Sequence, residues 1–67
     1  MKLSTRNQLA GKVAEVKLGT IMSEITVDVG GQNITAAITR TSAEELALAI
    51  GDDVTVLIKA TEVMLGK

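Results

Sequence analysis

The sequence predicts a mainly β fold, a small OB-like barrel of five strands with one short helix. Several segments alternate apolar and polar residues, a glycine pair separates two of them, and one segment instead follows a helical spacing. The chain has 67 residues, which is enough for one hydrophobic core and too few for a second. We therefore expect residues 1–67 to form a single domain.

Three strands follow directly from the alternation. Ile25–Val29 places its three aliphatic residues, Ile25, Val27 and Val29, on one face, and the same period returns in Gln32–Thr39 and in Val54–Ile58. Gly30–Gly31 separates the first two of these segments, and two glycines tolerate the positive φ angles of a two-residue hairpin turn. The sequence therefore predicts a hairpin around Gly30–Gly31 and a further strand near the end of the chain.

The predicted first strand, Leu9–Leu18, changes parity near its centre. Leu9, Gly11 and Val13 share one parity, whereas Val16 and Leu18 share the other. A β-bulge near Ala14–Glu15 inserts one residue and brings both halves onto the same face. A short fifth strand is predicted at Val63–Leu65.

One segment predicts a helix between the third and fourth strands. Ser42 and Glu45 have the spacing of a capping box, in which Ser42 is the N-cap. Gly51 is suited to end the helix. We therefore predict a helix at about Ala43–Ile50.

Composition argues against several classes of function. The chain has no His, Cys or Tyr, so the usual catalytic bases and nucleophiles are missing, and we predict that it is not an enzyme. Seven cationic and eight anionic residues give a net charge of −1, and no aromatic residue is present. Single-stranded nucleic acids are normally bound by a basic groove with stacking aromatics, so we expect no nucleic-acid partner.

Location and assembly follow from the apolar pattern. No apolar stretch approaches the ~18 residues that span a bilayer, and the N-terminus has no hydrophobic region of a signal peptide. We expect a cytoplasmic protein with no membrane partner. Apolar residues make up 46% of this short chain, which has no disulfide to stabilise it. This combination predicts that the chain forms a homo-oligomer.

Two polar segments, Ser4–Gly11 and Ile58–Val63, are the best candidates for a binding site. Each places one cation, Arg6 or Lys59, beside several neutral hydrogen-bond donors. Donors are also expected where the third strand meets the helix. A pocket with donors and no carboxylate favours an unprotonated tetrahedral dianion, because protonated phosphate also requires an acceptor. The segments therefore predict an oxyanion site.

Four segments carry a family resemblance: Ser4-x-Arg6-Asn7-Gln8-Leu9-x-Gly11, Ala37-Ile38-Thr39-x-x-Ser42, Leu46-x-Leu48-x-x-Gly51-Asp52 and Ile58-Lys59-Ala60-Thr61-Glu62-Val63-Met64. Together they resemble the molbindins, the small molybdenum-pterin-binding or Mop proteins, over nearly the whole chain. The resemblance implies an OB-like Mop domain and a homohexamer built as a trimer of dimers. It also implies that molybdate or tungstate binds between subunits.

The resemblance also implies particular ligand residues, with Ala60 acting through its backbone N–H. These are Ser4, Arg6, Thr39, Ser42, Lys59 and Ala60. A second oxyanion site near the threefold axis of the hexamer is implied at Gly19, Thr20, Ile21, Met22 and Ser23. Because the chain has no aromatic to stack on a pterin ring, we expect the ligand to be the bare oxyanion.

The implied function is cytoplasmic storage and homeostasis of molybdate or tungstate. An alternative is an oxyanion-sensing module that acts through a partner protein, since the same module occurs in molybdate-responsive regulators. Each ligand residue also has a structural interpretation. Ser42 is suited to cap the helix and Thr39 to end a strand. Lys59 is suited to be a solvated charge at a strand edge.

Overall fold

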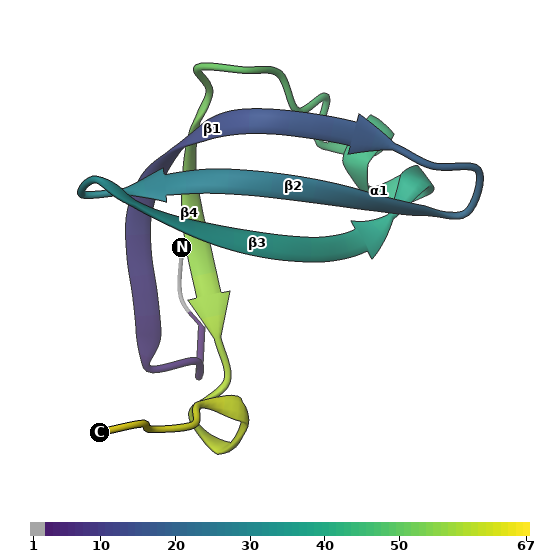
Figure 1. Cartoon of the computed structure of the whole chain (residues 1–67). Coiled ribbons are helices and arrows are strands. Elements are labelled where there is room, and N and C mark those ends of the chain that lie inside the picture. Colours follow the sequence, from purple (N-terminus) through teal and green to yellow (C-terminus); the bar gives the residue numbers. More distant parts are fainter. Residues whose placement is uncertain (1–2) are drawn as a thin grey trace.

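The computed structural model of the chain describes residues 3–67 (Figure 1). Its elements are β1 (Asn7–Leu18), β2 (Met22–Val29), β3 (Gln32–Thr39), α1 (Arg40–Glu45), β4 (Asp53–Ile58) and the 3₁₀ turn η1 (Ala60–Glu62). The four strands form one antiparallel sheet in the order β3-β2-β1-β4. Strands β3 and β4 are therefore the two edges of the sheet.

The hairpin between β2 and β3 forms where the glycine pair predicts it. Gly30 and Gly31 have φ angles of 59° and 89°, in the left-handed region that glycine adopts without a steric penalty. The carboxylate of Asp28 accepts a hydrogen bond of 2.8 Å from the N–H of Gly31. The pairing then runs without interruption from Val29 opposite Gln32 to Met22 opposite Thr39.

Strand β1 contains the predicted bulge and pairs with two strands, β2 and β4. Its pairing with β2 slips between Val13 and Glu15, which restores one inward face along the strand. The N-terminal half pairs with β4 and the C-terminal half with β2, so β1 bends sharply between them (Figure 1). Near this bend, a Cβ atom at Gly11 would lie 2.7 Å from the carbonyl oxygen of Asp28. Glycine at this position therefore permits a close approach of β1 and β2.

The hydrophobic core is small and made of aliphatic side chains. Val13, Ile25 and Val27 are buried at its centre, and half-buried side chains such as Val16 and Val56 pack around them. On the open side, an apolar hollow of about 310 Å³ extends between these core residues and the side chains of Leu46, Leu48, Val54 and Leu57. The isolated chain thus leaves part of its apolar surface uncovered.

The predicted five-stranded barrel is not formed. Within the described residues the sheet has four strands and does not close, although the prediction of a mainly β fold with one short helix is confirmed. Val63–Leu65 forms no strand, because the N–H of Val63 closes the 3₁₀ turn on the carbonyl of Ala60 at 3.3 Å. The chain then leads away from both edges of the sheet, and Met64 and Leu65 are 92% and 96% exposed.

The helix begins earlier than predicted, and its cap is different. Strand β3 passes directly into α1, so the first hydroxyl at the junction, Thr39, becomes the N-cap. The side-chain oxygen of Thr39 accepts a hydrogen bond of 3.1 Å from the N–H of Ser42. Ser42 therefore lies inside the helix and the predicted cap was wrong.

The helix also ends earlier, at Glu45 and not at Ile50. Ala47 has a φ angle of 50°, so the backbone leaves the right-handed helix before the predicted end. The following loop is held by the carboxylate of Asp52, which accepts a hydrogen bond of 2.9 Å from the N–H of Ala49. Leu46 and Ile50, which lie within the predicted helix, are instead exposed in the loop, at 66% and 72%.

Candidate functional site

Two segments distant in sequence meet at the free end of the β1–β4 ladder. Asn7 pairs with Ile58 as the last pair of that ladder, so the residues before Asn7 lie beside the residues after Ile58. Between them is a hollow of about 350 Å³, which we call the cationic hollow. It is lined by Ser4, Thr5, Arg6, Lys59, Ala60 and Thr61. The antiparallel pairing thus brings the two predicted cations to one place.

Side-chain hydrogen bonds shape the walls of the cationic hollow. The amide nitrogen Nδ2 of Asn7 donates to the carbonyl oxygen of Ile58 at 3.1 Å. The amide nitrogen Nε2 of Gln8 donates to the carbonyl oxygen of Thr5 at 2.7 Å, which folds the preceding segment back on β1. Both bonds therefore act on the segment that carries Arg6.

The cationic hollow has an excess of positive charge. None of its lining residues is a carboxylate. Among the described residues the ion pairs join Lys12 to Asp53, Lys17 to Glu15 and Arg40 to Glu44. Neither Arg6 nor Lys59 is thus neutralised by a carboxylate there, and two positive charges face a small space open to solvent.

Neutral donors complete the lining of the hollow. Ala60 begins the 3₁₀ turn η1, and the first N–H groups of such a turn have no partner inside it. Ser4 supplies a hydroxyl from the opposite wall. Four of the predicted ligand residues are therefore brought together within one chain, namely Ser4, Arg6, Lys59 and Ala60.

The other two predicted ligand residues lie elsewhere. Thr39 and Ser42 lie where β3, one edge strand, enters α1. We call this junction, which is at the N-terminal end of α1, the helix end. The cationic hollow follows β4, the opposite edge strand, and Figure 1 shows the two places well separated. The hydroxyl of Thr39 also lies 2.8 Å from that of Ser42, and the two are hydrogen-bonded to each other. A single chain thus does not assemble all six predicted residues.

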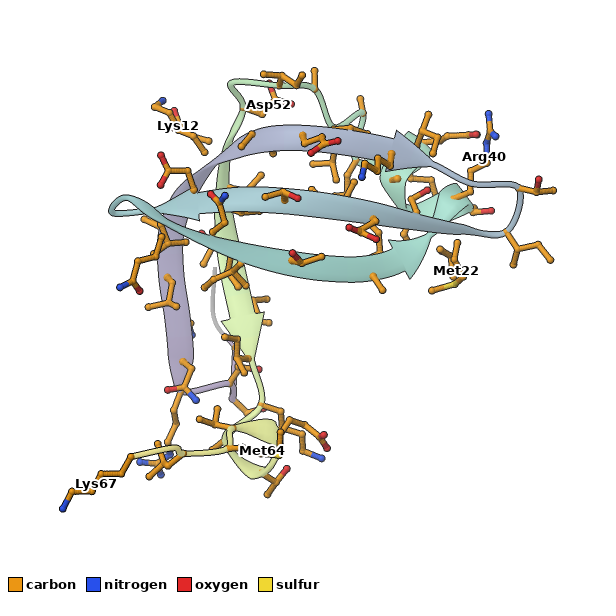
Figure 2. All side chains as sticks on the ribbon, in the orientation of Figure 1. Lys12, Met22, Arg40, Asp52, Met64 and Lys67 are labelled. Carbon is orange, nitrogen blue, oxygen red and sulfur yellow. The ribbon has the colours of Figure 1, made fainter. Side chains whose placement is uncertain are left out.

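The residues predicted for a second oxyanion site form the β1–β2 turn and the start of β2. They are Gly19, Thr20, Ile21, Met22 and Ser23. The turn is anchored to α1, because the N–H of Arg40 donates to the carbonyl of Ile21 at 2.8 Å. The guanidinium of Arg40 bonds both the carbonyl of Gly19, at 3.3 Å, and the carboxylate of Glu44, at 2.6 Å. Figure 2 shows Met22 and Arg40 together at this end of the molecule.

The two halves of this second group differ in burial. Ile21 is 76% exposed, whereas Ser23 is 3% exposed and its hydroxyl has no hydrogen-bond partner within the described residues. Arg40, the cation that bonds the turn, is already paired with a carboxylate. In the single chain this group therefore lacks the donor-only character of the cationic hollow.

Two lining residues were not among the predicted ligands. Thr5 and Thr61 contribute to the walls of the hollow, and Thr5 is half-buried. Their hydroxyls are visible in the sequence, but only the Asn7–Ile58 pairing shows that both segments face the same space. The register of the β1–β4 pairing is therefore the information needed to place Thr5 and Thr61 in the hollow.

Comparison with known proteins shows the family to which the chain belongs. The sequence matches the TOBE domain over residues 3–65. It is also 44% identical over 66 residues to molybdenum-pterin-binding protein 1 of Clostridium pasteurianum, with 97% of each chain covered. The chain belongs to the TOBE-domain family of molybdenum-pterin-binding (Mop) proteins. The predicted resemblance is therefore confirmed.

Solved structures of Mop-like proteins share the fold. A molybdate-binding protein from Sporomusa ovata superposes with a TM-score of 0.95 at 46% identity, over the full length of both chains. The cytoplasmic molybdate-binding protein ModG, solved with molybdate bound, gives a TM-score of 0.86 at 38% identity. That match covers 90% of this chain and 43% of ModG. These relatives are described as binding proteins and not as enzymes.

Two further findings concern membranes and metal cations. No helix within residues 3–67 is long and apolar enough to cross a membrane. The same residues contain no group of three or more carboxylate, His or Cys side chains that could hold a metal cation. The donors of the cationic hollow are suited to an anion.

Proposed function

We propose that this Mop protein binds molybdate in the cationic hollow and serves as a cytoplasmic store of the oxyanion. The observation that carries this proposal is the lining of the hollow, which includes the cations Arg6 and Lys59 and no carboxylate. Charge-assisted hydrogen bonds from such groups are shorter and stronger than neutral ones. The description of ModG as a cytoplasmic molybdate-binding protein supports the same ligand and location.

The chemistry of the lining favours one class of anion. Molybdate at neutral pH is a tetrahedral dianion without a proton, so all four of its oxygens accept hydrogen bonds. Phosphate near neutral pH often carries a proton, and this hollow has no carboxylate to accept it. Sulfate has the same charge as molybdate but is smaller, so the spacing of the donors must distinguish the two. Tungstate matches molybdate in charge and shape and should bind in the same way.

The complete site is proposed to lie between subunits. The cationic hollow supplies only part of the donor set, and Thr39 and Ser42 lie at the helix end of the same chain. A second copy that places its helix end over the hollow would close it with two hydroxyls. Oxyanion binding would then stabilise the oligomer, because the ligand would contact both chains.

The exposed apolar surface supports such an assembly. The tail residues Met64 and Leu65 and the loop residues Leu46 and Ile50 are each more than 60% exposed. The apolar hollow at the open side of the sheet adds further uncovered surface. Small proteins with so little core commonly bury such surface between copies. We propose a homohexamer arranged as a trimer of dimers.

A second oxyanion site is proposed at the β1–β2 turn, Gly19–Ser23. Arg40 is the cation at this turn, and it would have to leave Glu44 to bind an anion. Native mass spectrometry with molybdate should then detect more anions than one per chain. Saturation at one anion per chain would restrict binding to the cationic hollow.

The test of the proposed function is calorimetry with four anions: molybdate, tungstate, sulfate and phosphate. We expect molybdate and tungstate to bind at least tenfold more tightly than sulfate and phosphate, about the effect of one well-placed charged hydrogen bond. Titrations should be run at two salt concentrations, because exposed charge pairs weaken as salt rises. Equal affinity for all four anions would contradict the proposal.

A further inference from the structure

Asn7 occupies the junction between the ladder and the cationic hollow. It is the first residue of β1 and directly follows Arg6, while its backbone partner Ile58 directly precedes Lys59. Its side chain is half-buried and donates through Nδ2 to the carbonyl oxygen of Ile58 at 3.1 Å. One hydrogen bond thus joins two segments 51 residues apart in the sequence, each next to a cation.

Without the side-chain hydrogen bond of Asn7, the two segments at this junction would separate easily. The Asn7–Ile58 pair is the last of the β1–β4 ladder, and the ends of ladders are where local opening is easiest. Arg6 and Lys59 carry like charges, which repel each other before an anion arrives. Both effects would separate the two walls of the hollow.

We infer that Asn7 is a positioning residue for oxyanion binding. Its amide holds the segment of Arg6 against the segment of Lys59, so the two cations stay close enough for one anion to bridge them. Asn7 does not line the hollow itself, so its effect on the anion passes through the cations. The inference rests on the proposed function, because it assigns a role within the same site.

The bond requires a donor at Asn7. The group it contacts is a carbonyl oxygen, which only accepts, so a carboxylate of the same shape would lose the bond. Gln8 assists from the same strand by holding the carbonyl of Thr5 at 2.7 Å, but that contact is exposed and local. Within residues 3–67, the hydrogen bond of Asn7 is the side-chain bond that joins both walls.

A double-mutant cycle tests the inference. Molybdate affinity is measured by calorimetry on the full chain for the wild type, Asn7→Ala, Lys59→Ala and the double variant. We expect Asn7→Ala to weaken binding about tenfold, the effect of losing one half-buried hydrogen bond. In the Lys59→Ala background the same change should have little effect, because no second cation remains to be positioned.

Controls separate this role from a general loss of stability. Asn33→Ala, in an exposed position of β3, should leave affinity unchanged. Asn7→Thr suits a strand and removes the amide, so it serves if Asn7→Ala does not fold. Thermal unfolding is recorded for each variant, and only folded protein enters the cycle.

Each outcome decides a different point. Wild-type affinity in a folded Asn7 variant would overturn the inference and leave the proposed function intact. Losses that multiply in the double variant would also overturn it, because they would show an action independent of Lys59. A wild-type protein that binds no molybdate would overturn the proposed function and this inference together.

Discussion

The cationic hollow and the helix end both contain hydroxyl groups, but the two regions differ in how far their polar groups are already paired. At the helix end Thr39 and Ser42 already bond to each other, and Thr39 also caps α1. In the cationic hollow the described residues give Arg6 and Lys59 no carboxylate partner. If the proposed function holds, the hollow should supply most of the attraction for an anion, whereas the helix end would have to exchange existing hydrogen bonds to contribute.

The largest expected effect is the loss of the two cations. Replacing Arg6 and Lys59 together by alanine should weaken molybdate binding by roughly a hundredfold or more, since hydrogen bonds to charged groups contribute about 1.5–3 kcal/mol each. Calorimetry at fixed salt measures this change. The matched control is Lys12→Ala with Lys17→Ala, which removes two exposed cations outside the hollow. Equal losses in both double variants would show that only net charge matters.

Thr39→Ala should change both stability and affinity. The variant removes the N-cap of α1, which should lower the free energy of unfolding by about 1 kcal/mol. It also removes one proposed donor, so molybdate should bind several-fold more weakly, roughly the effect of one hydrogen bond. Thermal melts and calorimetry on the same sample measure the two effects.

Ser42→Ala separates these two roles. The cap bond uses the backbone N–H of Ser42, which the substitution keeps, so stability should change little. The hydroxyl is lost, so molybdate affinity should still fall several-fold, again about one hydrogen bond. If Ser42→Ala binds molybdate like the wild type, the hydroxyl of Ser42 is structural only.

Thr5→Ala tests a smaller contribution from within the cationic hollow. The hydroxyl of Thr5 is neutral and half-buried, and we expect its loss to weaken molybdate binding by about threefold, the low end for one hydrogen bond. Thr35→Ala, on an exposed position of β3, is the control. An unchanged affinity would place the Thr5 hydroxyl outside the ligand's reach.

The smallest effect concerns pH and a charge outside both regions. The hydrogen bond to Asp53, followed by its negative charge, raises the pKa of Lys12 above its ordinary value of 10.5. The stabilisation from this raised pKa is fully present below pH 10.5 and is lost as pH rises through the folded-state pKa. Melting temperatures of the wild type should therefore fall slightly more than those of Lys12→Met above that pH. Molybdate affinity between pH 6 and 9 should be the same in both proteins.

The sequence predicted the fold best where a residue pattern is compatible with only one simple local backbone geometry. The parity change after Val13 required a bulge, and the glycine pair required a turn, because each has one simple backbone solution. The helix was misplaced because capping depends on where β3 ends, and two hydroxyls, those of Thr39 and Ser42, competed for the role.

The residues of the candidate site could be predicted from the sequence, but the strand pairing that brings its two segments together could not. Arg6 and Lys59 stand out as isolated cations beside neutral donors, but their proximity depends on the long-range Asn7–Ile58 pairing. The predicted fifth strand at Val63–Leu65 failed for a related reason. A local apolar pattern shows that a segment needs a partner, and does not show that the partner lies in the same chain.

The central claim is that one oxyanion contacts the cationic hollow of one chain and the helix end of another. It is tested by mixing two variants that bind poorly alone, Arg6→Ala/Lys59→Ala and Thr39→Ala/Ser42→Ala. After refolding the two together in equal amounts, random assembly should restore about a quarter of the wild-type number of molybdate sites, because each restored site takes one intact half from each variant. Calorimetry that finds no more binding in the mixture than in its separate components would contradict the claim.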